Sequence, residues 1–445
     1  MSQPSAPKGL GKLYRHPTLS LIAAFGTYFC MYGFRKPYTA ATYSGVHFLG
    51  MDYKFMLIIA QTLGYVIAKW LGVRIISEIK PERRIRMLLF LILFAEGMLL
   101  LFGIVPRPWN MLCLFLNGLP LGLVFGLVLG FLEGRKNTEA LIAGLCASFI
   151  VSDGVSKSVG ALLLNMGVGE GWMPFFAGIL FLLPTCLFAA MLSRIPLPSK
   201  ADIAQRSERT PMNKQSRLDF FMKYAPGLAG IILVYLLVTL LRSLRADFAP
   251  ELWRELGYSK TPALLTQSEL LVSCGVVLIN GLAIFILNNK RAFQCSLLTC
   301  AGGFLIILLA LWGVQHGLNK FFFMVLVGLG VYIPYVAVHT TIFERLIAIT
   351  RERANVGFLM YLADSAGYTG YILLMLLIHA IPAGSSLLNI FLWGCLYVGL
   401  SGGLLILFCY WYFKIKQRNN NGYAIPIASC RVRPSFLMDR GILLN

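Results

Sequence analysis

The chain has 445 residues, of which 58% are hydrophobic and 13% are charged, and its formal net charge is +20. Apolar runs of 18 or more residues recur throughout, which excludes a soluble globular protein and indicates a helical membrane protein. The positive charge gathers in loops on one side of the expected spans, so it reports membrane topology, and we expect no nucleic-acid partner.

Twelve apolar stretches predict an all-α membrane protein with twelve transmembrane helices. Helices are expected because backbone groups in lipid must be hydrogen-bonded internally, and the ten-residue alternation of a β-barrel does not occur. The first stretch is too long for a signal peptide and lacks a small-x-small cleavage site, so we expect it to be retained. The expected spans are 17–43, 54–79, 85–105, 109–133, 139–164, 172–194, 224–248, 266–288, 292–314, 320–345, 353–380 and 386–415.

A basic segment with three prolines divides these spans into two sets of six. We expect an N-terminal half at 1–194, a cytoplasmic linker at 195–223, a C-terminal half at 224–415 and a cytoplasmic tail at 416–445. The side that holds both termini takes about 28 of the 39 Lys and Arg residues and the other side about 6, which predicts cytoplasmic termini by the positive-inside rule. A bacterial inner membrane is the expected location.

The two sets of spans carry an internal repeat. Arg35 lies in the first span and Arg242 in the seventh, and their positions differ by 207; Tyr28 and Tyr235, seven residues before each arginine, differ by the same number. Two repeated six-helix halves joined by a basic linker are the layout of the major facilitator fold. We therefore expect this fold, with pseudo-twofold symmetry and with the first and seventh helices lining a central cavity.

The two arginines are the leading candidates for a binding site. A guanidinium within a bilayer costs about 2.5–3.5 kcal/mol on insertion scales, so such arginines usually face an interior cavity. Arginine makes planar, bidentate contacts with phosphate or carboxylate oxygens. The alternative is a place among the outer headgroups, because each arginine comes about 18 residues, or roughly 27 Å, into its span. We expect a site for a small anion between the halves.

Polar stripes accompany both arginines at i, i+4, i+7 spacing, which places the members of each stripe on one helix face. The stripes are Tyr28, Tyr32 and Arg35 in the first span and Tyr235, Thr239 and Arg242 in the seventh. Lys36 points about 100° away from Arg35. Lys69 contributes a further cation from the second span.

Four other residues are candidates for coupling or gating. Asp153 and Lys157 are four residues apart in the fifth span, and we expect them to pair with each other. His339 could carry a proton, since its reference pKa is about 6.5, or could be a hydrogen-bonded core histidine. Asp364 could bind a proton or balance a cation.

The charged residues that we expect to reach the cavity leave a surplus of positive charge. The cations are Arg35, Lys36, Lys69, Lys157 and Arg242, and the acids are Asp153, Glu269 and Asp364. A surplus of about two charges suits a dianion such as a phosphate ester and repels cationic substrates.

Five segments resemble the organophosphate:inorganic phosphate antiporters of the major facilitator superfamily, which include the bacterial glycerol-3-phosphate transporter. The segments are Tyr32–Tyr38 with its Arg-Lys pair, Gly64–Lys69, Leu240–Pro250, Glu269, and Gly330–Pro334. The resemblance is spread over both halves and is weak between these segments. It indicates a divergent member of that family.

The resemblance implies that Arg35 and Arg242 clamp a phosphate group, that Lys69 adds positive field, and that Glu269 positions or balances the charge. One departure concerns the family's fifth helix, whose histidine has no counterpart in Leu141–Leu164. A second is the loop after the second span, where Ile76 and Ser77 stand in place of the family's Asp-Arg pair.

The expected function is secondary transport of a small organic anion, an organic phosphate exchanged for inorganic phosphate by alternating access. Two alternatives stay open, a proton-coupled symporter of a carboxylate or sugar and a transporter-like anion sensor without flux. No H-E-x-x-H or G-x-S-x-G motif occurs, so we do not expect an enzyme. We expect a monomer in the lipid bilayer, with no cofactor and no metal.

Overall fold

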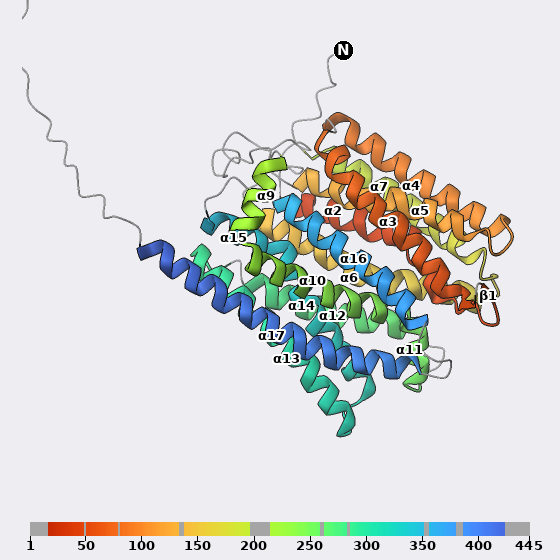
Figure 1. The fold of residues 1–445 in the computed structure, drawn as a ribbon. Helices are drawn as coiled ribbons and strands as arrows, with labels where there is room; N and C mark the ends of the chain where they lie inside the picture. Colours follow the sequence, from red (N-terminus) through yellow and green to blue (C-terminus); the bar gives the residue numbers. More distant parts are fainter. Residues whose placement is uncertain are drawn as a thin grey trace, which may run out of the picture.

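The computed structural model describes residues 17–48, 50–78, 81–132, 138–195, 214–258, 262–282, 285–350, 356–379 and 386–422. Eleven helices in this part of the chain are long and apolar enough to cross a membrane, and a shorter apolar helix covers Thr18–Phe34. The elements form twelve spans in two groups of six, one group on each side of the molecule (Figure 1). The predicted all-α membrane fold with two six-helix halves is confirmed.

The first half begins with α2 and continues through five long helices. A short hairpin of β1 and β2, paired antiparallel, connects the first span to the second. The elements are α2 (Pro17–Met31), η1 (Tyr32–Phe34), η2 (Pro37–Ala40), β1 (His47–Phe48), β2 (Met51–Asp52), α3 (Tyr53–Glu78), α4 (Pro81–Ile104), α5 (Met111–Leu132), α6 (Thr138–Asn165) and α7 (Met173–Ser193).

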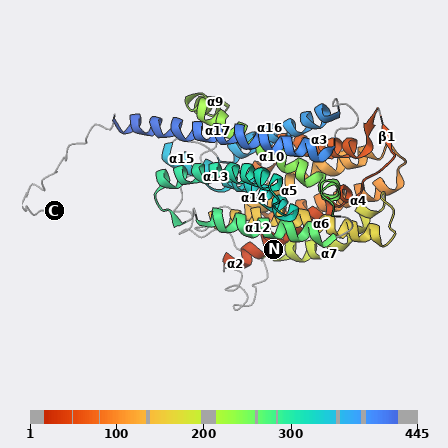
Figure 2. The same ribbon diagram turned by 90° about the horizontal axis from the view of Figure 1, so that it is seen from below.

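The second half repeats this arrangement and ends with the longest helix, α17, which extends beyond its neighbours (Figure 2). Its elements are α10 (Ala225–Asp247), α11 (Ala249–Glu255), α12 (Pro262–Leu282), α13 (Asn289–Gln315), α14 (Lys320–Ala337), the π-helical segment η4 (Val338–Ile342), α15 (Phe343–Thr350), α16 (Val356–His379) and α17 (Leu387–Gly422). A short helix, α9 (Lys214–Lys223), precedes α10 within the predicted linker. Residues 196–213 of that linker and 423–445 of the predicted tail lie outside the described residues.

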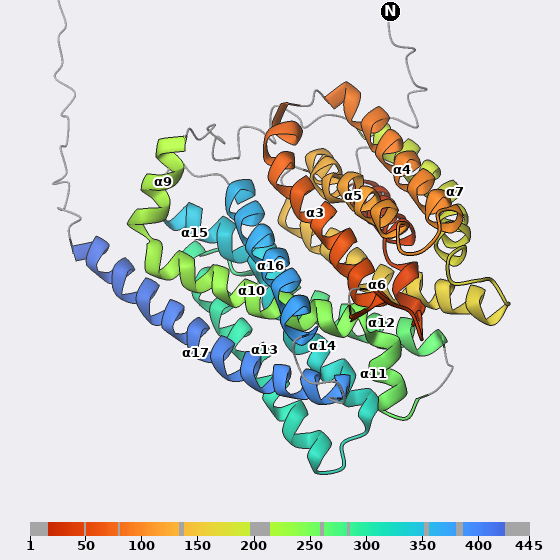
Figure 3. The ribbon, with the colours of Figure 1, turned by 45° about the vertical axis from the view of Figure 1, so that its right-hand side comes forward.

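The halves meet along two helix pairs. The helix α6 packs against α12, and α3 packs against α16 (Figure 3). The end of the molecule that carries η2, α11 and the start of α12 is named the α11 end, and the opposite end is named the α9 end. The long helices run from one end to the other, so residues at different positions along a helix lie at different distances from the α11 end.

Close packing within the first half depends on glycine. A Cβ atom on Gly118 of α5 would lie 2.2 Å from the Gln61 carbonyl oxygen of α3, and one on Gly64 would lie 2.1 Å from the Phe115 carbonyl oxygen. Small residues allow helix backbones to approach closely in membranes. This contact holds α3, which carries Lys69, against α5.

Two predicted spans are not continuous α-helices. The prediction of one helix over 17–43 is wrong, because α2 ends at Met31 and two 3-10 turns follow. Pro37 has no backbone N–H to donate to the carbonyl of Gly33, so a regular α-helix cannot continue through this residue. The span predicted at 320–345 contains η4, a π-helical segment of the kind often found at functional sites.

Candidate functional site

Arg35 lies in the break of the first span, between η1 and η2. The break leaves carbonyl groups without a helical partner, and buried side chains from two other helices donate to them. Gln61 Nε2 donates to the Arg35 carbonyl at 3.0 Å, and Asn117 Nδ2 donates to the Phe34 carbonyl at 3.2 Å. Gln61 also donates to Asn117 Oδ1 at 2.9 Å. These bonds fix the backbone that presents Arg35.

Arg35 and Arg242 are both buried, at 5% and 7% exposure. Among the described residues, neither has a carboxylate within ion-pairing distance, and the Nε atom of each has no hydrogen-bond partner. A buried donor without a partner is costly, and each Nε atom is free to donate to a further acceptor. Both side chains lie inside the protein, and the alternative position among the outer headgroups stays an untested alternative.

Tyrosine rings surround both guanidinium groups. The Cζ atom of Arg35 lies 3.9 Å from the ring centre of Tyr65, and that of Arg242 lies 4.5 Å from the ring centre of Tyr335. The Tyr368 ring is shared, at 5.9 Å from Arg35 Cζ and 5.8 Å from Arg242 Cζ. The distance between the two Cζ atoms therefore cannot exceed the two distances to the Tyr368 ring centre added together. Cation–π contacts stabilise both groups without neutralising them.

The other buried cations have carboxylate partners. Of the seven buried lysines and arginines among the described residues, five are paired. The pairs are Lys36–Asp247, Lys54–Glu251, Lys69–Asp364, Lys157–Asp153 and Arg245–Glu269. The surplus of two positive charges therefore rests on Arg35 and Arg242. A further buried acid, Glu96, lies on α4 against Gly178 of α7 and does not pair with them.

Asp364 of α16 is the centre of a second cluster. Its Oδ2 atom is 2.9 Å from Lys69 Nζ of α3, so this ion pair joins the halves. Its Oδ1 atom accepts a hydrogen bond from the Tyr235 hydroxyl and lies 3.5 Å from His339 Nε2 of η4. His339 Nδ1 lies 3.0 Å from the Tyr335 carbonyl oxygen. Both oxygens of the carboxylate are thus occupied.

A small central cavity of about 10 Å³ lies between the two arginines and the Asp364 cluster. Its walls are Tyr28, Tyr32, Tyr65, Lys69, Phe125, Phe149, Tyr335, His339, Asp364 and Tyr368. Four of these tyrosines, Tyr32, Tyr65, Tyr335 and Tyr368, also contact Arg35 or Arg242. The arginines therefore lie directly behind the tyrosines of the cavity wall.

The arginines and the Lys69–Asp364 pair lie at different depths along the helices. Arg242 is five residues from the end of α10, so it lies about 7.5 Å from the α11 end of that helix. Lys69 is sixteen residues from the start of α3, or about 24 Å from the same end. The arginines thus face the cavity from the α11 end and the Lys69–Asp364 pair closes it toward the α9 end.

Charged groups connect the halves at the α11 end. Lys36, before η2, pairs with Asp247 at the end of α10, and Lys54 Nζ of α3 lies 2.5 Å from Glu251 Oε1 of α11. Lys157 of α6 pairs with Asp153, as predicted, and also donates to a carbonyl of α10. These contacts hold the two halves together at this end.

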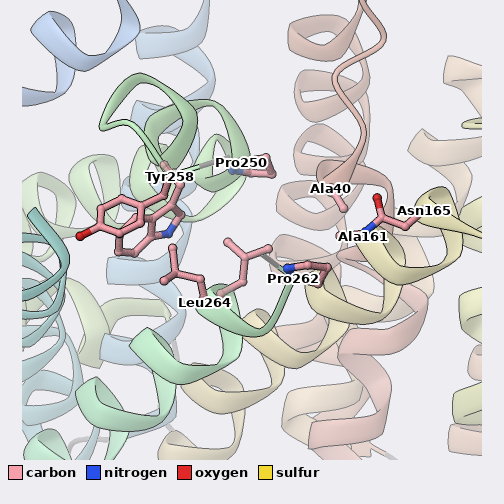
Figure 4. A pocket seen from close by; sticks show the side chains of 9 residues that line it. Ala40, Ala161, Asn165, Pro250, Tyr258, Pro262 and Leu264 are labelled. Carbon is pink, nitrogen blue, oxygen red and sulfur yellow. The ribbon is translucent and has the colours of Figure 1, made fainter. Parts of the chain in front are cut away.

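A second cavity, of about 110 Å³, opens between the halves beside these contacts. Ala40, Ala161 and Asn165 of the first half face Pro250, Tyr258, Pro262 and Leu264 of the second across it (Figure 4). No charged side chain lines the described wall. It is separate from the arginine pair.

The structure divides the predicted site residues into three groups. Tyr28, Tyr32, Lys69, His339 and Asp364 line the central cavity, Arg35 and Arg242 lie behind its tyrosines, and Tyr235 donates to Asp364. Lys36, Asp153 and Lys157 lie with the contacts of the α11 end. Glu269 Oε1 lies 2.6 Å from Arg245 Nη1, and its Oε2 has no hydrogen-bond partner among the described residues. Its implied role, to position or balance the substrate charge, stays a prediction.

Several residues of the site were not selected from the sequence. Tyr65, Tyr335 and Tyr368 supply most contacts to the arginines, and Phe125 and Phe149 complete the cavity wall. Lys54 and Arg245 were not counted among the buried cations. Tyr65 precedes Lys69 by one helical turn and Tyr368 follows Asp364 by one turn, so helical spacing from these polar residues would have found both tyrosines.

Comparison with solved structures identifies the architecture. The crystal structure of a bacterial homolog to the human lysosomal transporter Spinster, in an inward-facing and unoccupied conformation, matches with a TM-score of 0.57. The match covers 92% of this chain and 98% of that chain, at 13% sequence identity. The protein is thus an integral membrane protein with the twelve-helix major facilitator fold. At this identity the likeness concerns the fold alone.

A family model matches residues 37–416, and its description is a family of unknown function, DUF5690. The chain belongs to this family. No curated protein matches the chain.

Proposed function

We propose that this protein is a secondary transporter that exchanges an organic phosphate for inorganic phosphate by alternating access. The observation that carries the proposal is the pair of buried guanidinium groups, Arg35 and Arg242, which have no carboxylate partner among the described residues. The other five buried cations are neutralised. Two uncompensated charges beside the shared Tyr368 ring match the charge of a phosphate ester, and the arginine fork matches its oxygens. The resemblance of Tyr32–Tyr38 and Leu240–Pro250 to organophosphate antiporters agrees with this assignment.

In the proposed mechanism the anion bridges the two halves. It replaces the cation–π contacts of Tyr65, Tyr335 and Tyr368 with bidentate hydrogen bonds from Arg35 and Arg242. Because one guanidinium belongs to each half, a bound anion cancels their repulsion and favours the state in which the halves are closest. The loaded protein then reorients more readily than the empty one, which gives exchange. Such a shift requires that the anion bind the states with different affinity.

The contacts between the halves suggest an orientation. Ion pairs of Lys36 and Lys54 close the α11 end, which we assign to the outer face of a bacterial inner membrane. Both termini then lie in the cytoplasm, in agreement with the excess of basic residues in the loops on that side. The 1–194 and 224–415 halves act as the two rigid bodies of a monomer, joined by the 195–223 linker.

Counterflow in proteoliposomes tests the proposal. Vesicles preloaded with phosphate are expected to accumulate labelled phosphate, and Arg35→Lys and Arg242→Lys are each expected to abolish this uptake because lysine keeps the charge but loses the fork. Arg107→Lys is the matched control, since Arg107 is partly exposed and pairs with Glu170 in the loops. Unchanged uptake in both site variants would refute the clamp. Binding without flux would identify an anion sensor instead.

The Asp364 cluster favours a second candidate, proton-coupled symport of an organic anion. Asp364 and His339 face the cavity, and an anion that takes Lys69 would leave Asp364 free to bind a proton. Under this mechanism an uncoupler stops net uptake. In Asp364→Asn the rate of uptake no longer depends on pH. Under exchange, phosphate counterflow continues in the presence of the uncoupler.

A further inference from the structure

Glu96 of α4 is a buried acid that has no part in the proposed transport mechanism. It is 6% exposed, and neither of its carboxyl oxygens has a hydrogen-bond partner among the described residues. The other buried acids of this part of the chain each pair with a lysine or an arginine; they are Asp153, Asp247, Glu269 and Asp364. Glu96 therefore stands apart from them, because it is buried without a cation.

The position of Glu96 places its carboxyl group deep in the membrane and close to lipid. Glu96 lies within the apolar span Arg83–Ile104, eight residues from the end of the span, which is about 12 Å along the helix. Figure 3 shows α4 and α7 at the outer edge of the first half. Leu93 of α4 and Leu180 of α7 are exposed on this edge. Water is therefore remote from the carboxyl group.

A glycine on the neighbouring helix makes room for the carboxyl group. A Cβ atom on Gly178 of α7 would lie 2.0 Å from Glu96 Oε2, so this oxygen lies directly against the α7 backbone. The backbone N–H groups in the interior of a helix are already bonded within the helix. This surface therefore gives the carboxyl group neither a free donor nor a positive charge.

The elements packed against α4 bring no compensating charge to Glu96. They are α5, α7 and η1, and no Lys, Arg, Asp or Glu occurs in their described residues. Their titratable side chains are Cys113 of α5, Cys186 of α7 and Tyr32 of η1. On α4 itself, Arg86 is ten residues away, or about 15 Å along the helix. An ionised Glu96 would thus be an isolated charge.

We propose that Glu96 is a proton-binding site of the first half, a neutral carboxylic acid enclosed between α4 and α7 that a hydrophobic carbodiimide modifies. An unpaired carboxylate is strongly unfavourable in an apolar interior, and a bound proton removes its charge. The site is separate from Arg35 and Arg242, and it does not depend on the identity of the transported anion.

Infrared spectroscopy of the purified full-length protein tests for the proton directly. A protonated carboxyl group has a C=O stretching band that a carboxylate lacks. Wild type is expected to show this band at neutral pH, and Glu96→Gln is expected to lose it. Asp52→Asn is the control, because Asp52 is exposed in the β1–β2 hairpin, and it should leave the band unchanged. A carboxyl band of equal intensity in wild type and Glu96→Gln would overturn the proposal.

Modification by dicyclohexylcarbodiimide gives a second measurement, which needs no variant. The carboxyl O–H adds across one C=N bond of the reagent, so that the oxygen bonds to the central carbon and the proton moves to nitrogen. The O-acylisourea then rearranges to an N-acylurea by acyl transfer from oxygen to nitrogen, and every atom of the reagent stays on the protein. Mass spectrometry of peptides is expected to locate this added mass at Glu96.

Asp364 is the matched comparison within the same protein. It is as deeply buried as Glu96 but pairs with Lys69, so it has no carboxyl proton to supply and is expected to stay unmodified. Modification of Glu96 alone supports a neutral acid at this position. Absence of the added mass from Glu96, with or without modification of Asp364, would contradict it.

Discussion

Lys69 of α3 and Asp364 of α16 form an ion pair, 2.9 Å from Nζ to Oδ2, that joins the two halves beside the central cavity. Both side chains are almost fully buried, at 3% and 7% exposure. The attraction between two such charges is opposed by the cost of removing each from water. Replacing one partner is therefore expected to lower the stability of the protein strongly, whereas replacing both is expected to lower it little.

Asp364→Asn is predicted to destabilise the protein by about 3–5 kcal/mol, because Lys69 stays buried without its partner. The double variant Lys69→Met with Asp364→Asn is predicted to recover most of that loss. Thermal unfolding in detergent, followed for wild type, both single variants and the double variant, measures the coupling. Additive losses in the double variant would mean that the two charges do not interact.

Tyr65 is predicted to stabilise Arg35 through its ring and not through its hydroxyl group. The guanidinium carbon lies 3.9 Å from the ring centre, and a desolvated cation–π contact is worth about 2 kcal/mol. Tyr65→Leu should therefore lower the unfolding temperature, while Tyr65→Phe should match wild type. Equal losses in the two variants would assign the effect to the hydroxyl group.

Removal of the Lys54–Glu251 pair is predicted to open the α11 end. In the double variant Lys54→Met with Glu251→Leu, loss of about 1 kcal/mol from the closed state shifts the equilibrium roughly fivefold. A cysteine at Ala161, which lines the cavity between the halves at this end, should then react faster with a membrane-impermeant maleimide added outside the vesicles.

The control for this experiment is Asp52→Asn. It breaks the exposed His47–Asp52 pair, which lies within one half at the same end, and should leave labelling of the cysteine unchanged. Equal rates in the control and in the double variant would show that Lys54 and Glu251 do not gate this end.

Gly118→Ala is predicted to destabilise the first half. The new Cβ atom would lie 2.2 Å from the Gln61 carbonyl oxygen, which belongs to the α3 backbone, and overpacking of this kind costs about 1–3 kcal/mol. Gly302→Ala on α13 is the matched control, because nothing lies within 4 Å of its added Cβ atom. Thermal unfolding should separate the two variants, and equal stability would mean that α3 moves away without cost.

The fold could be predicted from the sequence because lipid allows few alternatives. Long apolar stretches require helices, and the 207-residue offset between Arg35 and Arg242 shows the repeat. The break after Met31 was missed, although Pro37 signals it, because its exact course depends on Gln61 and Asn117 from distant spans. The π-helical turn at His339 has no signal of this kind.

The candidate site was predictable only where its contacts are local. The Asp153–Lys157 pair follows from four-residue spacing on one helix. Lys69 and Asp364 are 295 positions apart, and no spacing rule connects residues of different halves. Arg245 and Glu269 belong to two different helices of one half, and helical spacing does not predict their pairing. The position of Tyr368 between the two arginines likewise appears only in the structure.

Calorimetric titration of inorganic phosphate into the purified protein tests the central claim most directly. If Arg35 and Arg242 together bind one dianion, wild type takes up one phosphate per chain, and Arg35→Lys and Arg242→Lys each lose this binding while Arg107→Lys retains it. Binding of phosphate that survives both site variants, or two independent sites that each disappear with one arginine, would contradict a shared clamp.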